Sequence, residues 1–337
     1  MSTPALEEHD YGDFSTKRKV ELEDFLLSDK CYRLPYVYKS EEQRRALRST
    51  KWGQRKLFCG ELFFILINGI HKLERVSMVY AGAAPGTHIH FLAELFPNIH
   101  WYLVDPSQFK VAKHKNITVI DSLFTDEVID KLLVKIPHDE LYFISDIRST
   151  TYNVGDEIED INSIVQSDMK LQEQWVRKMR PVLSMLKFRL PYNSEEDART
   201  EYLLGSIFFQ QWAGRSSTET RIIVRRPPND EEYPSFHYNN VDYDNIMFCF
   251  NILTRHRSFI TRINSKGFTD DFDSAAEEFL WEKYLLDHGM RVTKENVESL
   301  ADRLSNVIFN KKGQRLTGLE FKRQTSNKKY QGRPKPS

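Results

Sequence analysis

Residues 76–105, VSMVYAGAAPGTHIHFLAELFPNIHWYLVD, decide the fold of this chain. An apolar run, a glycine-containing loop, a helix-compatible segment and a second apolar run closed by an acid predict a strand, a tight loop, a helix and a strand. Gly82 and Gly86 let the backbone approach a ligand closely or take positive φ, and Pro85 fixes φ where the loop enters the helix. Asp105 can accept hydrogen bonds from both hydroxyls of a ribose. We therefore predict half of a nucleoside-cofactor site.

Two nucleoside cofactors use this arrangement, NAD and S-adenosylmethionine (SAM). The dinucleotide fingerprint needs G-x-G-x-x-G, so that amides at the helix start can hold a pyrophosphate. The run from Gly82 to Gly86 reads G-x-x-P-G and lacks the middle glycine. SAM has no pyrophosphate, so the loop favours SAM over NAD. A strand–helix–strand turn without any ligand remains an alternative, because a single glycine loop is a weak signal.

The composition is typical of a protein from a reducing compartment. The chain has 337 residues, enough to bury a sizeable core in one large domain or two. Its best apolar run, residues 62–67, is far shorter than the roughly 20 residues of a membrane span, so no membrane association is expected. The acidic start lacks the order of a secretory signal. Three scattered cysteines, Cys31, Cys59 and Cys249, argue against a disulfide frame or a metal site and favour the cytoplasm.

Charge is balanced overall but distributed unevenly. Lys plus Arg number 48, as do Asp plus Glu, so no global field draws the protein to nucleic acid. Residues 1–35 lack sustained periodicity and are predicted to form an N-terminal arm. Residues 311–337 carry nine bases and one acid, which is typical of a disordered tail that either touches RNA or an acidic partner or only aids solubility. Residues 36–310 remain as the folded domain.

Apolar periodicity predicts the elements around the opening stretch. Buried strands are expected at 140–145 and 181–190, with a long helix at 156–180 between them, and a buried helix at 53–70 comes before the glycine loop. This alternation predicts an α/β fold with a central, mostly parallel sheet flanked by helices. The other predicted elements are strands at 117–120, 202–210 and 219–225, and helices at 125–134, 241–254, 275–286 and 292–307.

Three charged residues stand where charge is costly. Lys56 lies near the start of the buried helix, an end that favours anions. Asp146 ends the strand 140–145, at the edge where parallel sheets bind ligands. Lys187 lies inside the strand 181–190, where an unpaired ammonium costs several kcal/mol. Lys56 could simply extend to solvent and Asp146 could cap the next turn, but Lys187 requires a partner.

Five sequence blocks, in this order, carry a resemblance to a known family: GQRKLFCGELFF (53–64), VYAGAAPGTHI (79–89), ISDIRS (144–149), PVLSMLKFR (181–189) and STETR (217–221). They resemble the poxvirus cap-specific mRNA (nucleoside-2′-O-)methyltransferases, which also serve as the small, regulatory subunit of poly(A) polymerase. The resemblance covers residues 50–255, roughly. It implies a Rossmann-like, SAM-dependent methyltransferase domain at 36–310. Its activity would be methylation of the ribose 2′-hydroxyl of the first transcribed nucleotide of m7G-capped mRNA.

The resemblance also implies roles for individual residues. The catalytic residues would be Lys56, Asp146, Lys187 and Glu219. The cofactor contacts would be Gln54, Tyr80, Gly82, Gly86, Asp105, Phe124, Asp146 and Arg148. The contacts with the cap and the RNA would be Tyr36 or Tyr38, Arg189, Tyr192, Ser194, Ser217, Thr218 and Asp244. The chain departs from the family at Ser107, where the family has an arginine, and at Ser194, where it has a second cap-binding carboxylate.

Several alternatives stay open at this point. Lys187 is predicted to contact the reacting hydroxyl, either as a neutral base or as a charged donor that steers it. The chain could instead be mainly a non-catalytic regulatory subunit of poly(A) polymerase, or a 2′-O-methyltransferase of uncapped RNA, and an NAD oxidoreductase is a more distant alternative. The expected partners are capped mRNA and a poly(A) polymerase catalytic subunit, in the cytoplasm or packaged in a virion.

Overall fold

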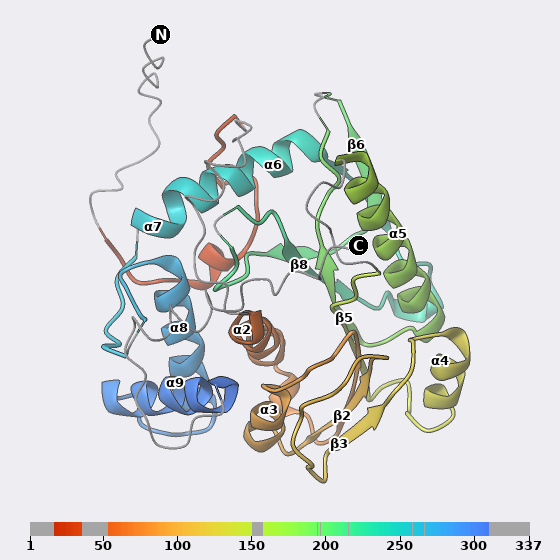
Figure 1. Ribbon diagram of the computed structural model, residues 1–337, viewed down its shortest axis with the longest axis horizontal. Coiled ribbons are helices and arrows are strands. Elements are labelled where there is room, and N and C mark those ends of the chain that lie inside the picture. The colour runs from red at the N-terminus through yellow and green to blue at the C-terminus, as the bar shows by residue number, and fades with distance from the viewer. Residues whose placement is uncertain are drawn as a thin grey trace, which may run out of the picture.

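The computed structural model describes residues 17–35, 53–149, 158–193, 195, 197–214, 216–257, 259–265 and 267–309. Figure 1 shows a central sheet with helices packed around it. Tyr36, Tyr38, Ser194 and the basic segment 311–337, which carry predictions made from the sequence, lie outside the described residues. Of the helices in the described ranges, none is both long and apolar enough to cross a membrane.

The main sheet, as far as the described ranges show it, has seven strands in the order β3-β2-β1-β4-β5-β8-β7. The strands from β3 to β5 are parallel, and β8 runs antiparallel to both of its neighbours. Every residue of β1 and β4 is buried, as expected for strands that helices cover on both faces. The strands are β1 (Val76–Ala81), β2 (Ile99–Val104), β3 (Ile117–Ile120), β4 (Leu141–Ser145), β5 (Leu183–Phe188), β7 (Ser206–Phe208) and β8 (Thr220–Arg225).

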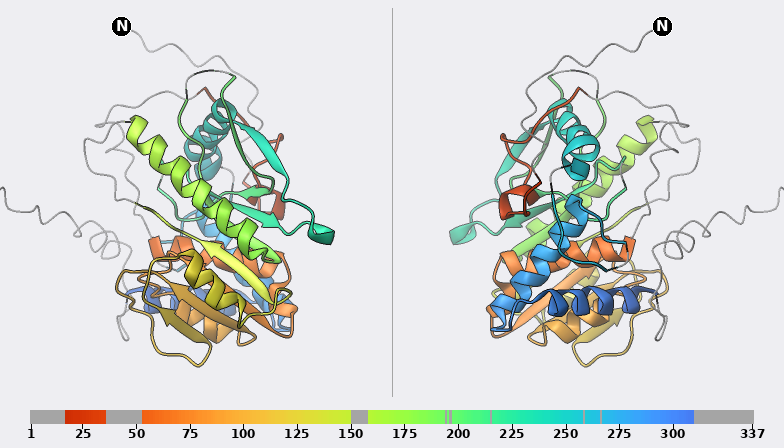
Figure 2. Two further views of the ribbon diagram at one scale, coloured as in Figure 1. Left: turned by 90° about the vertical axis from the view of Figure 1, so that its right-hand side faces the viewer. Right: turned by 90° about the vertical axis from the view of Figure 1, so that its left-hand side faces the viewer.

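Helices cover both faces of the sheet (Figure 2). One group consists of α2 (Gly53–Ile67), α3 (Ile89–Leu95), α8 (Phe272–Asp287) and α9 (Lys294–Phe309). The opposite side carries α4 (Asp126–Leu133) and the long α5 (Ile158–Met179), which packs against β5. The remaining helical segments are α6 (Asn240–Cys249), a π-helical turn (Phe250–Thr254), α7 (Arg255–Arg257) and short 3₁₀ turns at Leu22–Phe25, Ile70–Lys72 and Pro228–Asp230.

The predicted edge of the sheet is confirmed. β1 pairs with β2 on one side and with β4 on the other, so the strand order reverses at β1 and leaves a crevice at the carboxyl ends of these strands. Gly82 follows β1, Asp105 follows β2 and Asp146 follows β4. The Asp146 N–H donates to the Ala81 carbonyl at 3.0 Å, which ties two of these strand ends together.

A buried polar network fixes the start of α2. Arg55 Nη2 lies 2.6 Å from Glu277 Oε1, and the side chains are 1% and 0% exposed. The indole N–H groups of Trp212 and Trp281 donate to Glu277 at 2.8 and 3.1 Å. Because the Glu277 carboxylate accepts hydrogen bonds on both oxygens, its burial is compensated. The network holds the first turn of α2, which carries Lys56, in place.

The predicted single strand at 202–210 is wrong. β6 (Arg199–Leu203) pairs with β9 (Ser235–Asn239) in a separate two-stranded sheet, whereas β7 joins the main sheet. The chain changes sheets at Gly205, where an added Cβ would lie 2.5 Å from the carbonyl oxygen of Ile223. The periodicity also misses β9, which directly precedes the helix predicted at 241–254.

Part of the predicted N-terminal arm packs on the core. Phe25 is 0% exposed and its ring stacks on Phe63, with 4.8 Å between the ring centroids. Leu26 forms an isolated β-bridge with Phe208 of β7. Residues 17–35 therefore contribute to the hydrophobic core, and the domain boundary at residue 35 stays a prediction.

Candidate active site

Four charged side chains from separate elements meet at the edge of the sheet. Lys187 Nζ, on β5, lies 3.0 Å from Asp146 Oδ1 and 3.5 Å from Glu219 Oε2. Lys56 Nζ, on α2, lies 2.6 Å from Glu219 Oε1. The structure therefore brings together all four residues of the predicted catalytic set. It also supplies the partners that a lysine inside a buried strand requires.

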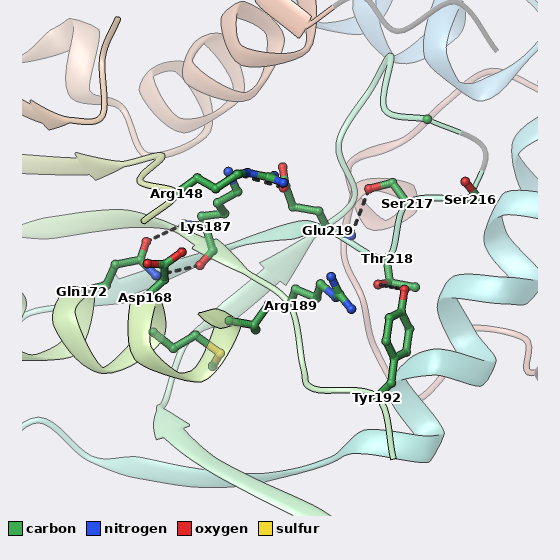
Figure 3. A pocket seen from close by; sticks show the side chains of 13 residues that line it. Arg148, Asp168, Gln172, Lys187, Arg189, Tyr192, Ser216, Ser217, Thr218 and Glu219 are labelled. Carbon is green, nitrogen blue, oxygen red and sulfur yellow. Dashed lines mark hydrogen bonds and ion pairs between the residues drawn. The ribbon is translucent and has the colours of Figure 1, made fainter. Parts of the chain in front are cut away.

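Two arginines complete this charge cluster. Arg221, 2% exposed, donates to Asp146 Oδ1 at 2.7 Å and lies 3.8 Å from Glu219 Oε1. It stands directly opposite Lys187 in the β5–β8 ladder. Arg148 Nη2 donates to Glu219 Oε2 at 3.1 Å (Figure 3). Sequence reasoning missed Arg221, although the cost of burying a charge in a strand, which singled out Lys187, applies equally to it.

The carboxylates of the cluster are held in their ionised form. Burial raises the pKa of Asp146, but Lys187 and Arg221 outweigh burial and bring the pKa to about 2. Burial also opposes ionisation of Glu219, yet Lys56 and Lys187 hold its pKa well below the ordinary value. The pKa of Lys56 is lowered by burial more than Glu219 raises it. At neutral pH the cluster thus presents two carboxylates to several cations.

A cavity of about 940 Å³, here called the loop cavity, opens beside the cluster at the carboxyl ends of β1, β2 and β4. Phe124 and Trp175 supply an apolar part of its wall, which suits a flat ring. Six of the predicted cofactor residues line it: Gln54, Gly82, Asp105, Phe124, Asp146 and Arg148. The prediction of a cofactor half-site therefore falls on a real cavity of suitable size.

Two predicted cofactor residues, Tyr80 and Gly86, are not part of that lining. Tyr80 is 2% exposed within β1, where burial raises the pKa of its hydroxyl well above the ordinary value. Gly86 has φ +63° and turns the loop toward α3. Gln54 has a second task besides lining the cavity, because its Oε1 accepts from the Thr87 N–H at 3.0 Å and so holds the loop.

Gly82 and Asp105 shape the loop cavity directly. Gly82 has φ +79°, and an added Cβ would lie 2.8 Å from the backbone carbon of Asp146. Any larger residue would therefore separate the loop from the charge cluster. Asp105 Oδ2 accepts from the Ala84 N–H at 3.1 Å and Oδ1 from the Ser107 N–H at 2.8 Å. A carboxylate oxygen accepts more than one hydrogen bond, so Asp105 can also bind a ribose hydroxyl.

A smaller cavity of about 230 Å³, here called the Tyr192 cavity, also has Lys187 in its wall (Figure 3). Its walls include predicted substrate residues, namely Arg189, Tyr192, Ser217 and Thr218. Arg148 and Lys187 line both cavities. Lys187 therefore lies where the two cavities meet.

The predicted base-binding residues form a second polar group near the Tyr192 cavity. The Arg189 guanidinium carbon lies 4.2 Å from the centre of the Tyr192 ring, and the Tyr192 hydroxyl lies 3.3 Å from Thr218 Oγ1. A ring that stacks a guanidinium can also stack a flat cationic base. Asp244 on α6 is 5% exposed, and burial raises its pKa to about 7 although Arg189 opposes the shift. Asp244 lines neither cavity.

Solved structures are similar to this chain only in part. A Plasmodium falciparum protein described as a ribosomal RNA methyltransferase aligns with a TM-score of 0.32 and 10% identity, over 53% of this chain and 98% of its own. Human methyltransferase-like protein 13, in complex with SAH, aligns with a TM-score of 0.33 and 10% identity, over 53% of this chain and 84% of its own.

Curated relatives and a family model match the sequence more directly. The cap-specific mRNA (nucleoside-2′-O-)-methyltransferase of Fowlpox virus (strain NVSL) is 29% identical over 197 residues, 55% of this chain and 62% of that protein. The protein of the same name from Myxoma virus (strain Lausanne) is 30% identical over 178 residues, 51% of this chain and 52% of that protein. The chain thus spans about half to three fifths of the length of these relatives. The family model described as poly A polymerase regulatory subunit matches residues 32–312. Since that match covers most of the chain and the whole charge cluster, the chain belongs to the poly A polymerase regulatory subunit family.

Proposed function

We propose that the chain transfers a methyl group from SAM to the ribose 2′-hydroxyl of the first transcribed nucleotide of m7G-capped mRNA. The observation that carries this proposal is the position of Lys187, paired with Asp146 and Glu219 where the loop cavity and the Tyr192 cavity meet. A donor bound in one cavity and an acceptor bound in the other would approach each other beside Lys187. The names of the viral relatives support the same chemistry.

The loop cavity fits SAM on three counts. Asp105 offers a carboxylate to the ribose hydroxyls, Gly82 lets the loop approach the Asp146 backbone more closely than a Cβ would allow, and Phe124 offers an apolar face to the adenine. Asp146, ionised at neutral pH, would stand near the positive sulfur. When bound, SAM supplies a methyl group activated by the sulfonium.

The charge cluster would prepare the acceptor. In an in-line displacement, the hydroxyl oxygen must point at the methyl carbon and its proton must leave. Lys187 Nζ is placed to hold that oxygen, while Asp146 and Glu219 fix the position of Nζ from two sides. Lys56 and Arg221 in turn hold the two carboxylates. The cluster therefore orients one amine without leaving either carboxylate unpaired.

The Tyr192 region would bind the cap. The 7-methylguanine base carries a positive charge, so it stacks on an aromatic face more strongly than guanine does. Tyr192 offers such a face, currently covered by the Arg189 guanidinium, and Asp244 offers a buried carboxyl that can accept from the base edge. Cap binding would thus replace one flat cation on Tyr192 by another.

The direct test compares RNAs that differ only in the N7-methyl group of the cap. We expect the protein with SAM to methylate the m7G-capped transcript, with the product localised to the first 2′-hydroxyl by nuclease digestion and mass spectrometry. An uncapped transcript of the same sequence is included, and equal rates on all of these RNAs would favour a methyltransferase of uncapped RNA. No methylation of any transcript, with SAM binding intact, would overturn the proposed activity.

Asp105→Ala is expected to weaken SAM binding by about 1.5–3 kcal/mol, because the variant loses charge-assisted hydrogen bonds to the ribose. Isothermal titration calorimetry measures this loss. Asp121→Ala, which removes an exposed acid that lies outside the loop cavity, serves as the matched control. Unchanged affinity of the Asp105 variant would place the cofactor elsewhere.

Cap affinity is expected to depend on pH through Asp244. Its pKa of about 7 means that the carboxylate, the better acceptor, forms as the pH rises through 7. The ratio of wild-type to Asp244→Asn affinity for a 7-methylguanosine cap analogue should therefore rise about tenfold between pH 6 and pH 8. Taking the ratio cancels the titration of the ligand itself. A ratio that is independent of pH would exclude Asp244 from the cap site.

The family description supports a second proposed role, as a regulatory subunit that binds a poly(A) polymerase catalytic subunit. The two roles can be separated with a variant that lacks the amine of Lys187 and leaves the surface unchanged. If that variant still supports polyadenylation while methyl transfer is lost, both roles belong to the chain. Stimulation of the polymerase by a protein without any methyl-transfer activity would favour the non-catalytic alternative.

A further inference from the structure

Helix α5 holds the backbone of the candidate active site through two side-chain amides. Gln172, 1% exposed, donates from Nε2 to the Lys187 carbonyl at 3.0 Å, and its Oε1 accepts from the Lys187 N–H at 3.1 Å. Figure 3 shows the Gln172 amide facing this part of β5. One carboxamide thus satisfies both backbone groups of the residue that we place at the reacting hydroxyl.

The Gln172 contact stands where the sheet opens. β4 pairs with β5 as far as Ser145 opposite Leu186, and the β4 chain then turns away into the segment that carries Asp146. Lys187 is the next residue of β5. Backbone groups that face such an opening need another partner, because buried N–H and C=O groups are rarely left unpaired. The Gln172 amide acts there as a short substitute for the missing strand.

Asn162, ten residues earlier on α5, repeats the same contact at the base-binding residue. Its Nδ2 donates to the Tyr192 carbonyl at 2.8 Å, and its Oδ1 accepts from the Tyr192 N–H at 2.9 Å. A backbone N–H can only donate and a carbonyl can only accept, so the orientation of both carboxamides follows from their partners. Two side-chain amides on one helix therefore bind the backbone N–H and C=O groups of the two site residues in the same way.

The spacing of these contacts indicates that the segment from Lys187 to Tyr192 is extended. Ten residues of α-helix rise about 15 Å. The five-residue step from Lys187 to Tyr192 spans at most about 17 Å when fully extended. The segment between the two contacts therefore runs extended and antiparallel to α5, since its later residue, Tyr192, contacts the earlier helix residue, Asn162. The two contacts therefore fix the backbones of Lys187 and Tyr192 relative to α5.

We propose that Gln172 and Asn162 are positioning residues, Gln172 for the methyl-transfer chemistry at Lys187 and Asn162 for recognition of the cap base at Tyr192. This inference rests on the proposed function. It assigns separate kinetic consequences to two amides that make identical contacts. A purely structural role would lower the concentration of active protein and leave kcat per active site and KM unchanged, so the two roles can be told apart once active sites are counted.

The experiment compares Gln172→Met and Asn162→Leu, which keep the side-chain volume and remove the hydrogen bonds to the backbone, with Gln166→Leu. The control variant replaces an exposed carboxamide on the same helix. Gln172→Met is expected to lower kcat at least tenfold with KM for capped RNA within threefold. Asn162→Leu is expected to raise KM for capped RNA, and Kd for the cap analogue, at least fivefold with kcat within threefold. Gln166→Leu should match the wild type. The active-site concentration is set by titration with S-adenosylhomocysteine.

The proposal would be overturned if Gln172→Met and Asn162→Leu changed kcat and KM in the same way as each other. It would also be overturned if neither variant changed either constant. Failure of both Gln172→Met and Gln172→Asn to fold would do the same, because the amide would then serve folding alone. The activity of the wild type and of Gln166→Leu tests the proposed function separately. If both lack activity, amide hydrogen exchange still tests the proposed contacts. Gln172→Met should speed exchange of the Lys187 N–H only, and Asn162→Leu that of the Tyr192 N–H only.

Discussion

Lys187→Ala is expected to slow methyl transfer about a thousandfold and to leave the affinities for SAM and for the cap analogue within about threefold. A proton-transfer group contributes about 10²–10⁴-fold to a rate, and an interaction made only in the transition state affects kcat rather than binding. Within the described residues, Lys187 is the lysine that lines both cavities, whereas Lys56 lines the loop cavity alone. Single-turnover rates at saturating SAM measure the effect.

Two further variants identify what Lys187 does. Lys170→Ala removes an exposed lysine from α5 and should behave as the wild type. Lys187→Arg keeps the charge but cannot give up its proton, so it retains partial activity only if the amine acts as a charged donor. If Lys187→Ala kept more than a tenth of the wild-type rate, Lys187 would have no part in the chemistry.

The sequence could predict those site residues whose charge would be unfavourable in a buried position without a partner. A lysine inside an apolar strand needs a partner, and Lys187 has two, Asp146 and Glu219. The glycine loop and the acid after the next strand are placed by chain order alone, because parallel strands bring their carboxyl ends to one edge. The apolar runs on either side of the glycine loop and helix also predicted β1 and β2 correctly.

Features that depend on contacts between distant segments could not be predicted in this way. The break at Gly205 reflects the close approach of Ile223, which is 18 residues away in sequence (223 − 205) and adjacent only in the folded sheet. Tyr80 is one residue of a continuous apolar run, and nothing in that run reveals that its side chain is buried and takes no part in lining the loop cavity. The contacts of the α5 amides have no local signal either, since an asparagine or glutamine on a helix is usually exposed.

Arg221→Met is expected to lower the free energy of unfolding by about 3–5 kcal/mol at pH 7, the usual cost of removing one member of a buried ion cluster. Arg221 is 2% exposed and donates to Asp146 at 2.7 Å, so its loss leaves two buried carboxylates with one cation fewer. Methionine fills most of the space, which separates the loss of charge from the loss of packing. Urea denaturation measures the change, and Arg225→Met, an exposed arginine on the same strand, should stay within about 0.5 kcal/mol of the wild type.

The deficit of Arg221→Met should shrink as the pH falls. In the wild type the pKa of Asp146 is about 2 and that of Glu219 is also depressed, so both contribute stability above their ordinary pKa values and lose it as the pH falls through the folded values. Without Arg221 both pKa values rise, so this contribution is smaller and less is lost on acidification. We expect the gap between wild type and variant to stay constant while both carboxylates are ionised in the two proteins, and to narrow only in acid, as the pH falls through the raised pKa values of the variant toward about 2. A gap that stayed constant in acid as well would mean that packing, rather than charge, explains why an arginine is buried beside the methyl-transfer lysine.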